Sequence, residues 1–212
     1  MDGASSKSDR APHRAVTARA PAPDVPDHEF RFHFYANRPC LDLLSTIGER
    51  WRGAFERLRA PSDLRTWVTQ AGLADDVARV TQADLDDVRR LRAAIGSLVF
   101  ATIDEEALPA ADLAVVNADA ARPDLTPVLD ATGVGHAPAR ATVSQVRATL
   151  ARDVIDLVAT GDVDRVRECG ADDCSVLFYD SSRPGTRRWC SMAGCGNRNK
   201  AAAHRRRHRT AR

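Results

Sequence analysis

The sequence predicts a mainly α-helical N-terminal domain with a small β-hairpin, followed by a compact four-cysteine module that ends in a basic helix. Three observations lead to this prediction. Apolar residues recur at helical spacing through residues 30–160, four of the five cysteines form two matched pairs after residue 168, and the last 32 residues contain ten Lys/Arg but no Asp/Glu. We expect a disordered tail over residues 1–28, a helical domain over 29–161 and the cysteine module over 162–212.

Size and composition indicate the general class of protein. The chain has 212 residues and a mass of 23.1 kDa, which suits one domain with an additional small module. Hydrophobic residues make up 43% of it, enough for a packed core. No apolar run reaches the ~18 residues of a membrane-spanning helix, and no apolar signal segment follows the N-terminus. These features argue against an integral membrane protein and favour a cytoplasmic location.

Charge is distributed unevenly along the chain. The overall net charge is +2, but residues 1–180 contain 21 Lys/Arg and 29 Asp/Glu, a net charge of −8. The basic C-terminal segment contains no acidic residue to balance it. An acidic body with a basic end is typical of a protein whose end binds a polyanion, most often nucleic acid.

The first elements of the expected helical domain lie between Phe30 and Phe55. Aromatic residues alternate with other residues over 30–35, which predicts a short strand or an extended lead-in. Asn37 can cap a helix that has Pro39 in its first turn. Apolar residues then recur at intervals of three and four, which predicts one amphipathic helix carrying Leu41, Leu44, Ile47, Trp51 and Phe55.

Cap and stop residues delimit the following helices. Ser62 is expected to cap a short helix that ends at Gly72, and Thr81 with Asp84 forms a capping-box pattern that opens a long helix. Pro109 is placed to start a third helix. The core-facing residues of these helices are expected to be Leu64, Trp67, Val68, Leu85, Val88, Leu91, Ile95, Leu98, Val99, Leu113 and Val116.

The end of the expected helical domain combines a turn and a helix. Gly133 and Gly135 predict a small hairpin within 125–139, and Pro127 would confine it to an edge. A further helix is predicted to end at Gly161. Its buried face is expected to carry Val143, Val146, Leu150, Val154 and Leu157.

The paired cysteines have the spacing C-x4-C-x15-C-x4-C and are Cys169, Cys174, Cys190 and Cys195. Two disulfides would need an oxidising compartment, for which no export signal is seen, and a redox dithiol usually has the spacing C-x-x-C. Four thiolates suit a tetrahedral zinc ion with no open position, so we predict one structural Zn²⁺. Cys40 is expected to be an ordinary buried helix residue.

The spacer between the cysteine pairs has the length of a hairpin. Val176–Tyr179 and Thr186–Trp189 are predicted to be its strands, with residues 182–185 in its turn. This hairpin would bring both cysteine pairs together around the metal. Asp180 would either brace it through a neighbouring arginine side chain or cap the turn at the end of the first strand.

The segment after the last cysteine predicts a basic helix about 20 Å long, which fits the major groove of DNA. Asn197 can cap this helix, and residues 201–203 are alanines that favour it. One stripe, within about 60° around the axis, collects Arg198, Arg205, Arg209 and Arg212. The residues predicted to contact nucleic acid, with DNA as the expected partner, are Arg187, Arg188, Arg198, Lys200, Arg205, Arg206, Arg209 and Arg212. A tail that aids solubility or binds RNA without specificity is the alternative interpretation.

Several segments resemble a known pair of domains. Residues 189–200, W-C-S-M-A-G-C-G-N-R-N-K, resemble the hallmark of the CGNR zinc finger family, and residues 174–182, C-S-V-L-F-Y-D-S-S, resemble the family's preceding strand. Residues 39–46 and the L-x-x-W…G-L pattern of residues 64–73 resemble the ABATE domain that usually precedes this finger. The likeness covers about residues 30–208.

This resemblance has implications for the site and the function. It implies that the four paired cysteines are zinc ligands and that Arg198 belongs to the hallmark motif. It also implies a bacterial, stress-induced transcription regulator whose finger binds DNA. Ser45 stands where the family usually has Asn, so the resemblance implies no ligand role at that position.

Polar residues of the first predicted helix form a candidate ligand pocket: Asp42, Ser45, Thr46 and Arg50. Three of them would share one helix face at positions i, i+4 and i+8. That face would be either the wall of a small-molecule pocket or an ordinary ion-paired side of a helix.

The hypothesis that unites these features is a transcription regulator that is not an enzyme. Its helical domain would sense an effector or form a homodimer, and its zinc finger would dock the basic helix on DNA. No nucleophile–base pair, phosphate-binding glycine loop or open metal site in the sequence points to catalysis. The alternative hypotheses are a zinc-dependent protein-interaction module and a non-specific RNA binder.

Overall fold

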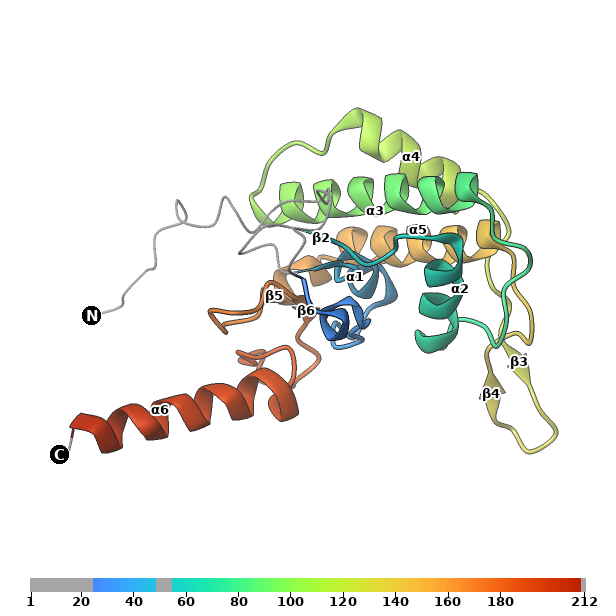
Figure 1. Ribbon diagram of the computed structural model, residues 1–212. Coiled ribbons are helices and arrows are strands. Elements are labelled where there is room, and N and C mark those ends of the chain that lie inside the picture. The colour runs from blue at the N-terminus through green and yellow to red at the C-terminus, as the bar shows by residue number, and fades with distance from the viewer. Residues whose placement is uncertain (1–24, 49–54, 211–212) are drawn as a thin grey trace.

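The computed structural model describes residues 25–48 and 55–210 (Figure 1). The tail expected over residues 1–28 lies mostly outside the described residues, and its last part enters a short 3-10 turn, η2 (Asp27–Phe30). No paired strand follows over residues 31–36 in the described chain, so of the two predicted alternatives, a short strand or an extended lead-in, the strand does not form.

Three helices form the centre of the fold: α3 (Gln82–Ile103), α4 (Ala110–Ala120) and α5 (Val143–Ala159). They pack on one another, while α1 (Pro39–Leu44) packs against α3 and α5, and α2 (Pro61–Gln70) against α3 (Figure 1). The largest fully buried side chains include Trp67, Leu85, Leu91, Ile95, Leu150 and Leu157. The prediction of a mainly helical domain with these core residues is therefore confirmed.

Helix ends that were predicted correctly are fixed by residues close to them in the sequence. The Thr81 hydroxyl accepts from the Asp84 amide (3.2 Å), and the Asp84 carboxylate accepts from the Thr81 amide (2.8 Å). This reciprocal pair satisfies two amides that a helix start leaves without partners. Helix α5 ends just before Gly161, which adopts φ +76° and so needs the freedom of glycine.

The first helix is shorter than predicted, and this corrects the expected helix from residue 41 to Phe55. Helix α1 ends at Leu44, and the chain continues as β1 (Ile47–Gly48), paired antiparallel with β2 (Phe55–Glu56). A Cβ atom on Gly48 would lie 2.3 Å from the Phe55 ring, so this pairing requires glycine. Ile47 and Phe55 are both buried, but they belong to the two strands of a hairpin and not to one helix. Their helical spacing in the sequence therefore suggested the wrong element.

The start of α2 also differs from the prediction. Ser62 does not cap the helix, because Pro61 already occupies its first position. The carboxylate of Asp63 instead accepts from the amides of Arg59 (2.9 Å) and Ala60 (2.8 Å). A carboxylate at this end also suits the positive end of the helix dipole.

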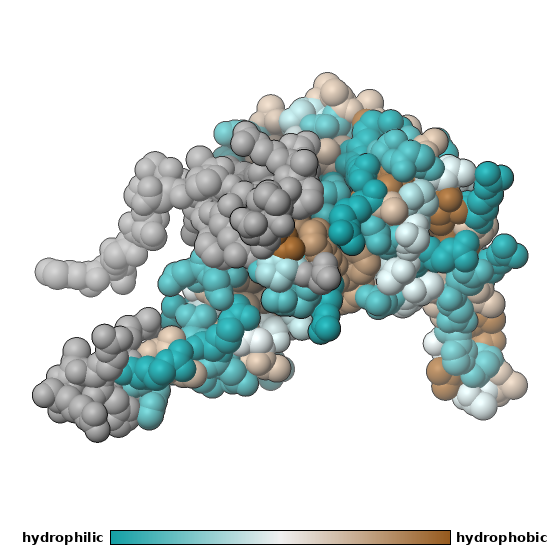
Figure 2. Space-filling model, in the orientation of Figure 1, coloured by the Kyte–Doolittle hydropathy of each residue, from teal (hydrophilic) through white to brown (hydrophobic). Residues whose placement is uncertain are grey.

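The hairpin expected within residues 125–139 is confirmed. Strand β3 (Val128–Leu129) pairs antiparallel with β4 (Gly135–His136), and the Asp130 carboxylate accepts from the turn amides of Thr132 and Val134. The hairpin extends away from the helices, and apolar residues gather on its surface (Figures 1 and 2).

The cysteine module contains η3 (Asp162–Arg165), β5 (Val166–Glu168), β6 (Leu177–Tyr179), the π-helical turn η4 (Met192–Gly196) and α6 (Asn197–Thr210). Strand β6 pairs with β5, whereas residues 186–189 form no strand, so the predicted pairing partner was wrong. The Tyr179 amide donates to the Ala36 carbonyl (2.8 Å), and Phe178 belongs to the same buried core as the helices. The module therefore packs directly on the helical part.

Candidate metal centre and basic helix

The four paired cysteines come from separate parts of the module and converge. Cys169 directly follows β5, Cys174 precedes β6, and Cys190 and Cys195 lie before and within η4. All four sulfur atoms lie within 4.8 Å of one another, and the side chains are buried except for the half-buried Cys174. The sequence-predicted cluster thus forms in the described structure.

Two of the sulfur–sulfur distances equal the edge of a zinc tetrahedron, and the whole cluster is compact enough for one metal ion. The Sγ atom of Cys190 lies 3.8 Å from that of Cys174 and 3.7 Å from that of Cys195. A tetrahedron with Zn–S bonds of about 2.3 Å has sulfur–sulfur edges of about 3.8 Å. Four protein ligands fill the coordination sphere, so the centre suits a structural and not a catalytic metal.

The clustered cysteines shift one another's pKa values, because their sulfur atoms lie close together. The thiols of Cys174 and Cys190 donate to Cys169 and hold its pKa well below its usual range, whereas the same contacts raise the pKa of Cys190. Zinc binding supplies the positive charge that allows all four sulfurs to ionise.

Asp180 organises the turn that leads to the second cysteine pair. Its side chain is fully buried, and its carboxylate accepts from the amides of Ser182 (3.0 Å) and Arg187 (2.8 Å). Burial alone would raise the pKa of Asp180, but the hydrogen bonds outweigh it and hold the pKa below its ordinary value. Of the two sequence-based interpretations, the turn-capping role is the one observed.

Residues 186–189 follow this turn and support the metal centre without forming a strand. The Arg188 carbonyl accepts from the Gly170 amide (2.9 Å), beside Cys169. The Arg187 guanidinium donates to the carbonyls of Trp189 (2.8 Å) and Cys190 and lies 4.7 Å above the Phe178 ring. Arg187 therefore braces a ligand-bearing loop, while the exposed Arg188 lies over the Trp189 ring.

Helix α6 leaves the metal centre and extends away from the rest of the molecule (Figure 1). Its lead-in turn η4 is capped by Ser191, whose hydroxyl accepts from the Gly194 amide (3.1 Å), so the predicted Asn197 cap is corrected. The Arg198 guanidinium donates to the Asp173 carboxylate (3.1 Å) and contacts the Cys195 sulfur (3.3 Å). Arg198 therefore compensates negative charge at the metal centre.

The remaining predicted nucleic-acid contacts lie further along α6. Lys200 and Arg205 are exposed, and hydrophilic residues follow the described part of this helix (Figure 2). Arg206 and Arg209 occupy positions in the helix. Arg212 lies outside the described residues.

Comparison with known proteins accounts for nearly the whole described chain. The ABATE family model, described as "Putative stress-induced transcription regulator", matches residues 37–161. The chain belongs to the ABATE family. The CGNR zinc finger model matches residues 165–208, which include all four clustered cysteines, so the metal centre is that of a zinc finger with one structural Zn²⁺. Among curated proteins, none matched this sequence.

The order of the two matches is the one that the sequence motifs implied: an N-terminal ABATE domain followed by a CGNR zinc finger. Within the described ranges, no helix combines the length and apolarity needed to cross a bilayer.

The three described residues of the predicted ligand pocket, Asp42, Ser45 and Thr46, do not line one cavity in the ABATE domain. Thr46 follows α1 and accepts from the buried Arg92 guanidinium (2.7 Å), so it no longer shares a helix face with Asp42. Asp42 accepts from the Ala36 amide (3.0 Å). Arg50 lies outside the described residues, and of the other three only Ser45 lines the cavity described below.

Asp42 sets a testable pH dependence of stability. Burial raises its pKa from the ordinary 3.8 to about 6, with the Ala36 amide opposing this and Asp153 adding to it. Because the folded-state pKa is the higher one, stability is present at low pH and is lost as the pH rises through about 6. We expect Asp42→Asn to stabilise the protein by about 1–2 kcal/mol at pH 7.5 and by roughly half as much at pH 5.

Urea unfolding of both proteins at the two pH values measures this difference. Asp75→Asn, at an exposed position of the same domain, is the matched control and should change little at either pH. An equal gain for Asp42→Asn at both pH values would show that ionisation is not the cause.

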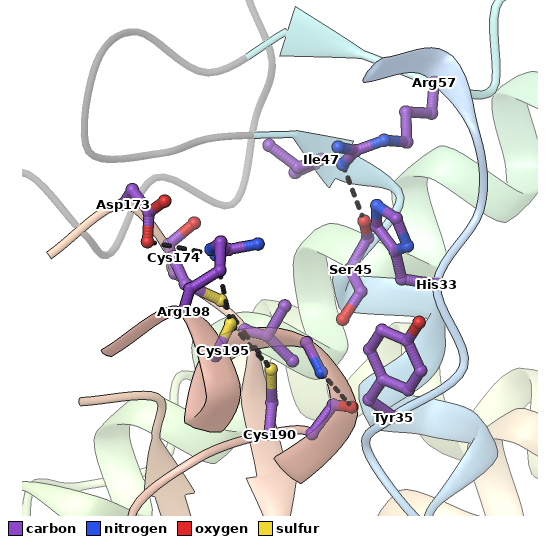
Figure 3. A pocket seen from close by; sticks show the side chains of 14 residues that line it. His33, Tyr35, Ser45, Ile47, Arg57, Asp173, Cys174, Cys190, Cys195 and Arg198 are labelled. Carbon is purple, nitrogen blue, oxygen red and sulfur yellow. Dashed lines mark hydrogen bonds and ion pairs between the residues drawn. The ribbon is translucent and has the colours of Figure 1, made fainter. Parts of the chain in front are cut away.

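A cavity of about 190 Å³ lies where the ABATE domain meets the zinc finger (Figure 3). One wall comes from the ABATE side and consists of His33, Tyr35, Ser45, Ile47 and Arg57. The opposite wall comes from the finger and includes Asp173, Cys174, Cys190, Ser191, Cys195 and Arg198. We call this space the junction cavity.

Sequence reasoning missed most of the junction cavity. His33 and Tyr35 alternate with Phe32 and Phe34, which pack against the core, so the alternation carried a usable signal. The opposing wall includes predicted zinc ligands, but it is distant in sequence, and no sequence signal indicated that it would meet His33 and Tyr35. Burial, followed by the charges of Arg57 and Arg198, lowers the pKa of His33 to about 4, so its ring is neutral at physiological pH.

Proposed function

We propose that this protein is a DNA-binding transcription regulator in which the zinc finger presents α6 to the duplex. The observation that carries the proposal is the placement of α6: a basic helix that starts at the zinc centre and projects from an acidic body (Figure 1). The ABATE domain would sense a signal or mediate dimerisation. The activity is binding and not catalysis.

The charge pattern of α6 suits a duplex groove. Arg198 is engaged at the zinc centre, whereas Arg205 and Arg209 continue along the same side, and Lys200 and Arg206 occupy other sides. A helix in the major groove has phosphates along both of its flanks. Basic residues on several sides can therefore neutralise both strands, and binding should depend strongly on salt.

The same geometry favours DNA over double-stranded RNA. The major groove of B-form DNA is about 12 Å wide and admits an α-helix, whereas the major groove of A-form RNA is too narrow to be read. The net charge of −8 on residues 1–180 would repel a nucleic acid from the body. Contact should therefore be concentrated on the finger and α6.

Substitutions in α6 test this function. We expect Arg205→Ala combined with Arg209→Ala to weaken binding to a short DNA duplex about tenfold and to reduce the slope of log K against log salt by about 2, because two phosphate contacts are lost. Fluorescence anisotropy over a range of salt concentrations measures both quantities. Arg79→Ala combined with Arg140→Ala removes the same charge from exposed positions of the ABATE domain and should leave the slope unchanged.

Two outcomes would count against the proposal. An unchanged slope in the α6 variant would remove these arginines from the interface. Partners retained by the protein from nuclease-treated lysate, together with no duplex binding, would favour the protein-interaction module.

A further inference from the structure

The junction cavity joins groups from both domains that can donate hydrogen bonds. Neither the ring nitrogens of His33 nor the hydroxyl of Tyr35 has a hydrogen-bond partner among the residues that the structure describes, and the two rings stack 5.7 Å apart. The Ser191 hydroxyl accepts from the Gly194 amide, which leaves its own proton to donate. Figure 3 shows His33 and Tyr35 beside this space, which Ser191 also lines.

Arginine side chains in the lining make an anion the favoured ligand of these donors. The guanidinium of the buried Arg57 lies on the same wall and donates to the carbonyls of Glu29 (2.7 Å) and Ser45 (3.1 Å). Arg57 and Arg198 bring two cationic side chains to the lining of the cavity, one from each wall. Among the described residues of the lining, Asp173 is the one carboxylate, and Arg198 pairs with it.

The zinc-bound thiolates restrict where an anion could lie. They belong to the finger wall, where Arg198 compensates part of their charge. An anion would therefore lie on the side of His33, Tyr35 and Arg57, away from the sulfur atoms (Figure 3). The volume of about 190 Å³ is below the roughly 300–1,000 Å³ of drug-sized pockets, so only a small molecule would fit.

We propose that the junction cavity binds a small organic anion whose carboxylate or phosphate oxygens accept hydrogen bonds from His33, Tyr35 and Ser191. Its ligand contacts both the ABATE domain and the zinc finger. Occupancy therefore favours one arrangement of the two domains and so affects the placement of α6. This regulatory consequence rests on the proposed function, whereas the binding itself does not.

Calorimetric titration of the zinc-loaded full-length protein tests the site. The probes are sodium succinate and inorganic phosphate, each compared with sodium chloride at the same ionic strength, and they distinguish a carboxylate site from a phosphate site. We expect saturable binding of at least one probe at one site per chain. Tyr35→Phe and His33→Gln should each weaken it about tenfold, because each alters a hydrogen bond to a charged group.

Three controls make the outcome decisive. His136→Gln changes a histidine of the β3–β4 hairpin, outside the cavity, and should bind the probe like the wild type. The α6 variant lacking Arg205 and Arg209 should also retain the binding, which separates the cavity from the basic helix. Zinc content and melting temperature establish that the His33 variant is folded, and Tyr35→Phe removes only an oxygen from a side chain that is 43% exposed.

The proposal is overturned if neither probe binds beyond the chloride control. It is also overturned if binding persists unchanged in both cavity variants or disappears in the α6 variant. These measurements contain no DNA, so their failure is separate from a failure of the proposed function.

Discussion

Cys190→Ser is expected to abolish stoichiometric zinc binding. Cys190 is central to the cluster, since its sulfur lies within 3.8 Å of those of Cys174 and Cys195. A hydroxyl is a poor replacement for a thiolate ligand, and the free energy of zinc binding is largely the folding free energy of such a small module. Zinc content should fall from one equivalent to near zero, measured by elemental analysis after gel filtration.

Cys190→Ser should destabilise the ABATE domain without unfolding it. Most residues of the shared core come from its own helices, so helical circular dichroism is expected to persist. Because Phe178 and Cys190 belong to that same core, the melting temperature should nevertheless fall. Cys40→Ser is the matched control: Cys40 is buried in α1, away from the cluster, and this variant should retain one zinc. A full zinc equivalent in the Cys190 variant would refute the ligand assignment.

Arg187→Ala is expected to lower zinc affinity by about 10- to 100-fold, the usual cost of removing a group that orients metal ligands. The guanidinium donates to the carbonyls of Trp189 and Cys190 and covers the Phe178 ring, so its loss frees the loop that carries a ligand. Competition with a chromophoric chelator measures the affinity.

Arg183→Ala provides the comparison for this prediction. Arg183 is an exposed arginine in the same turn, and its removal should leave zinc affinity unchanged. With zinc saturated, the Arg187 variant should keep the wild-type salt dependence of DNA binding. A reduced salt slope with normal zinc affinity would contradict this role and would support the prediction that Arg187 contacts DNA.

The parts of the fold that depend on neighbouring residues were predictable from sequence. Thr81 with Asp84 marks the start of α3, and apolar spacing identifies α3 and α5. The cysteine spacing predicted the metal centre because four soft ligands in two matched pairs have few alternative explanations. These features require no knowledge of how distant segments meet.

The sequence-based predictions were wrong where contacts between separate segments decide the structure and the local spacing of apolar residues does not. Ile47 and Phe55 fit a helical period but are buried from opposite strands of a hairpin, a pairing that depends on Gly48. In the finger, β6 pairs with β5 on its N-terminal side, because the residues after the turn are held instead by Asp180. The junction cavity was missed for the same reason, since its walls come from two domains.

The central claim is that the zinc centre holds α6 in a DNA-binding position. Stepwise addition of zinc to the metal-stripped protein, with binding to a labelled DNA duplex followed by anisotropy at near-physiological salt, tests this most directly. The account predicts that binding rises with added zinc and saturates at one equivalent per chain. Equal binding before and after zinc addition would contradict it, because the basic segment would then act as a tail that needs no folded finger.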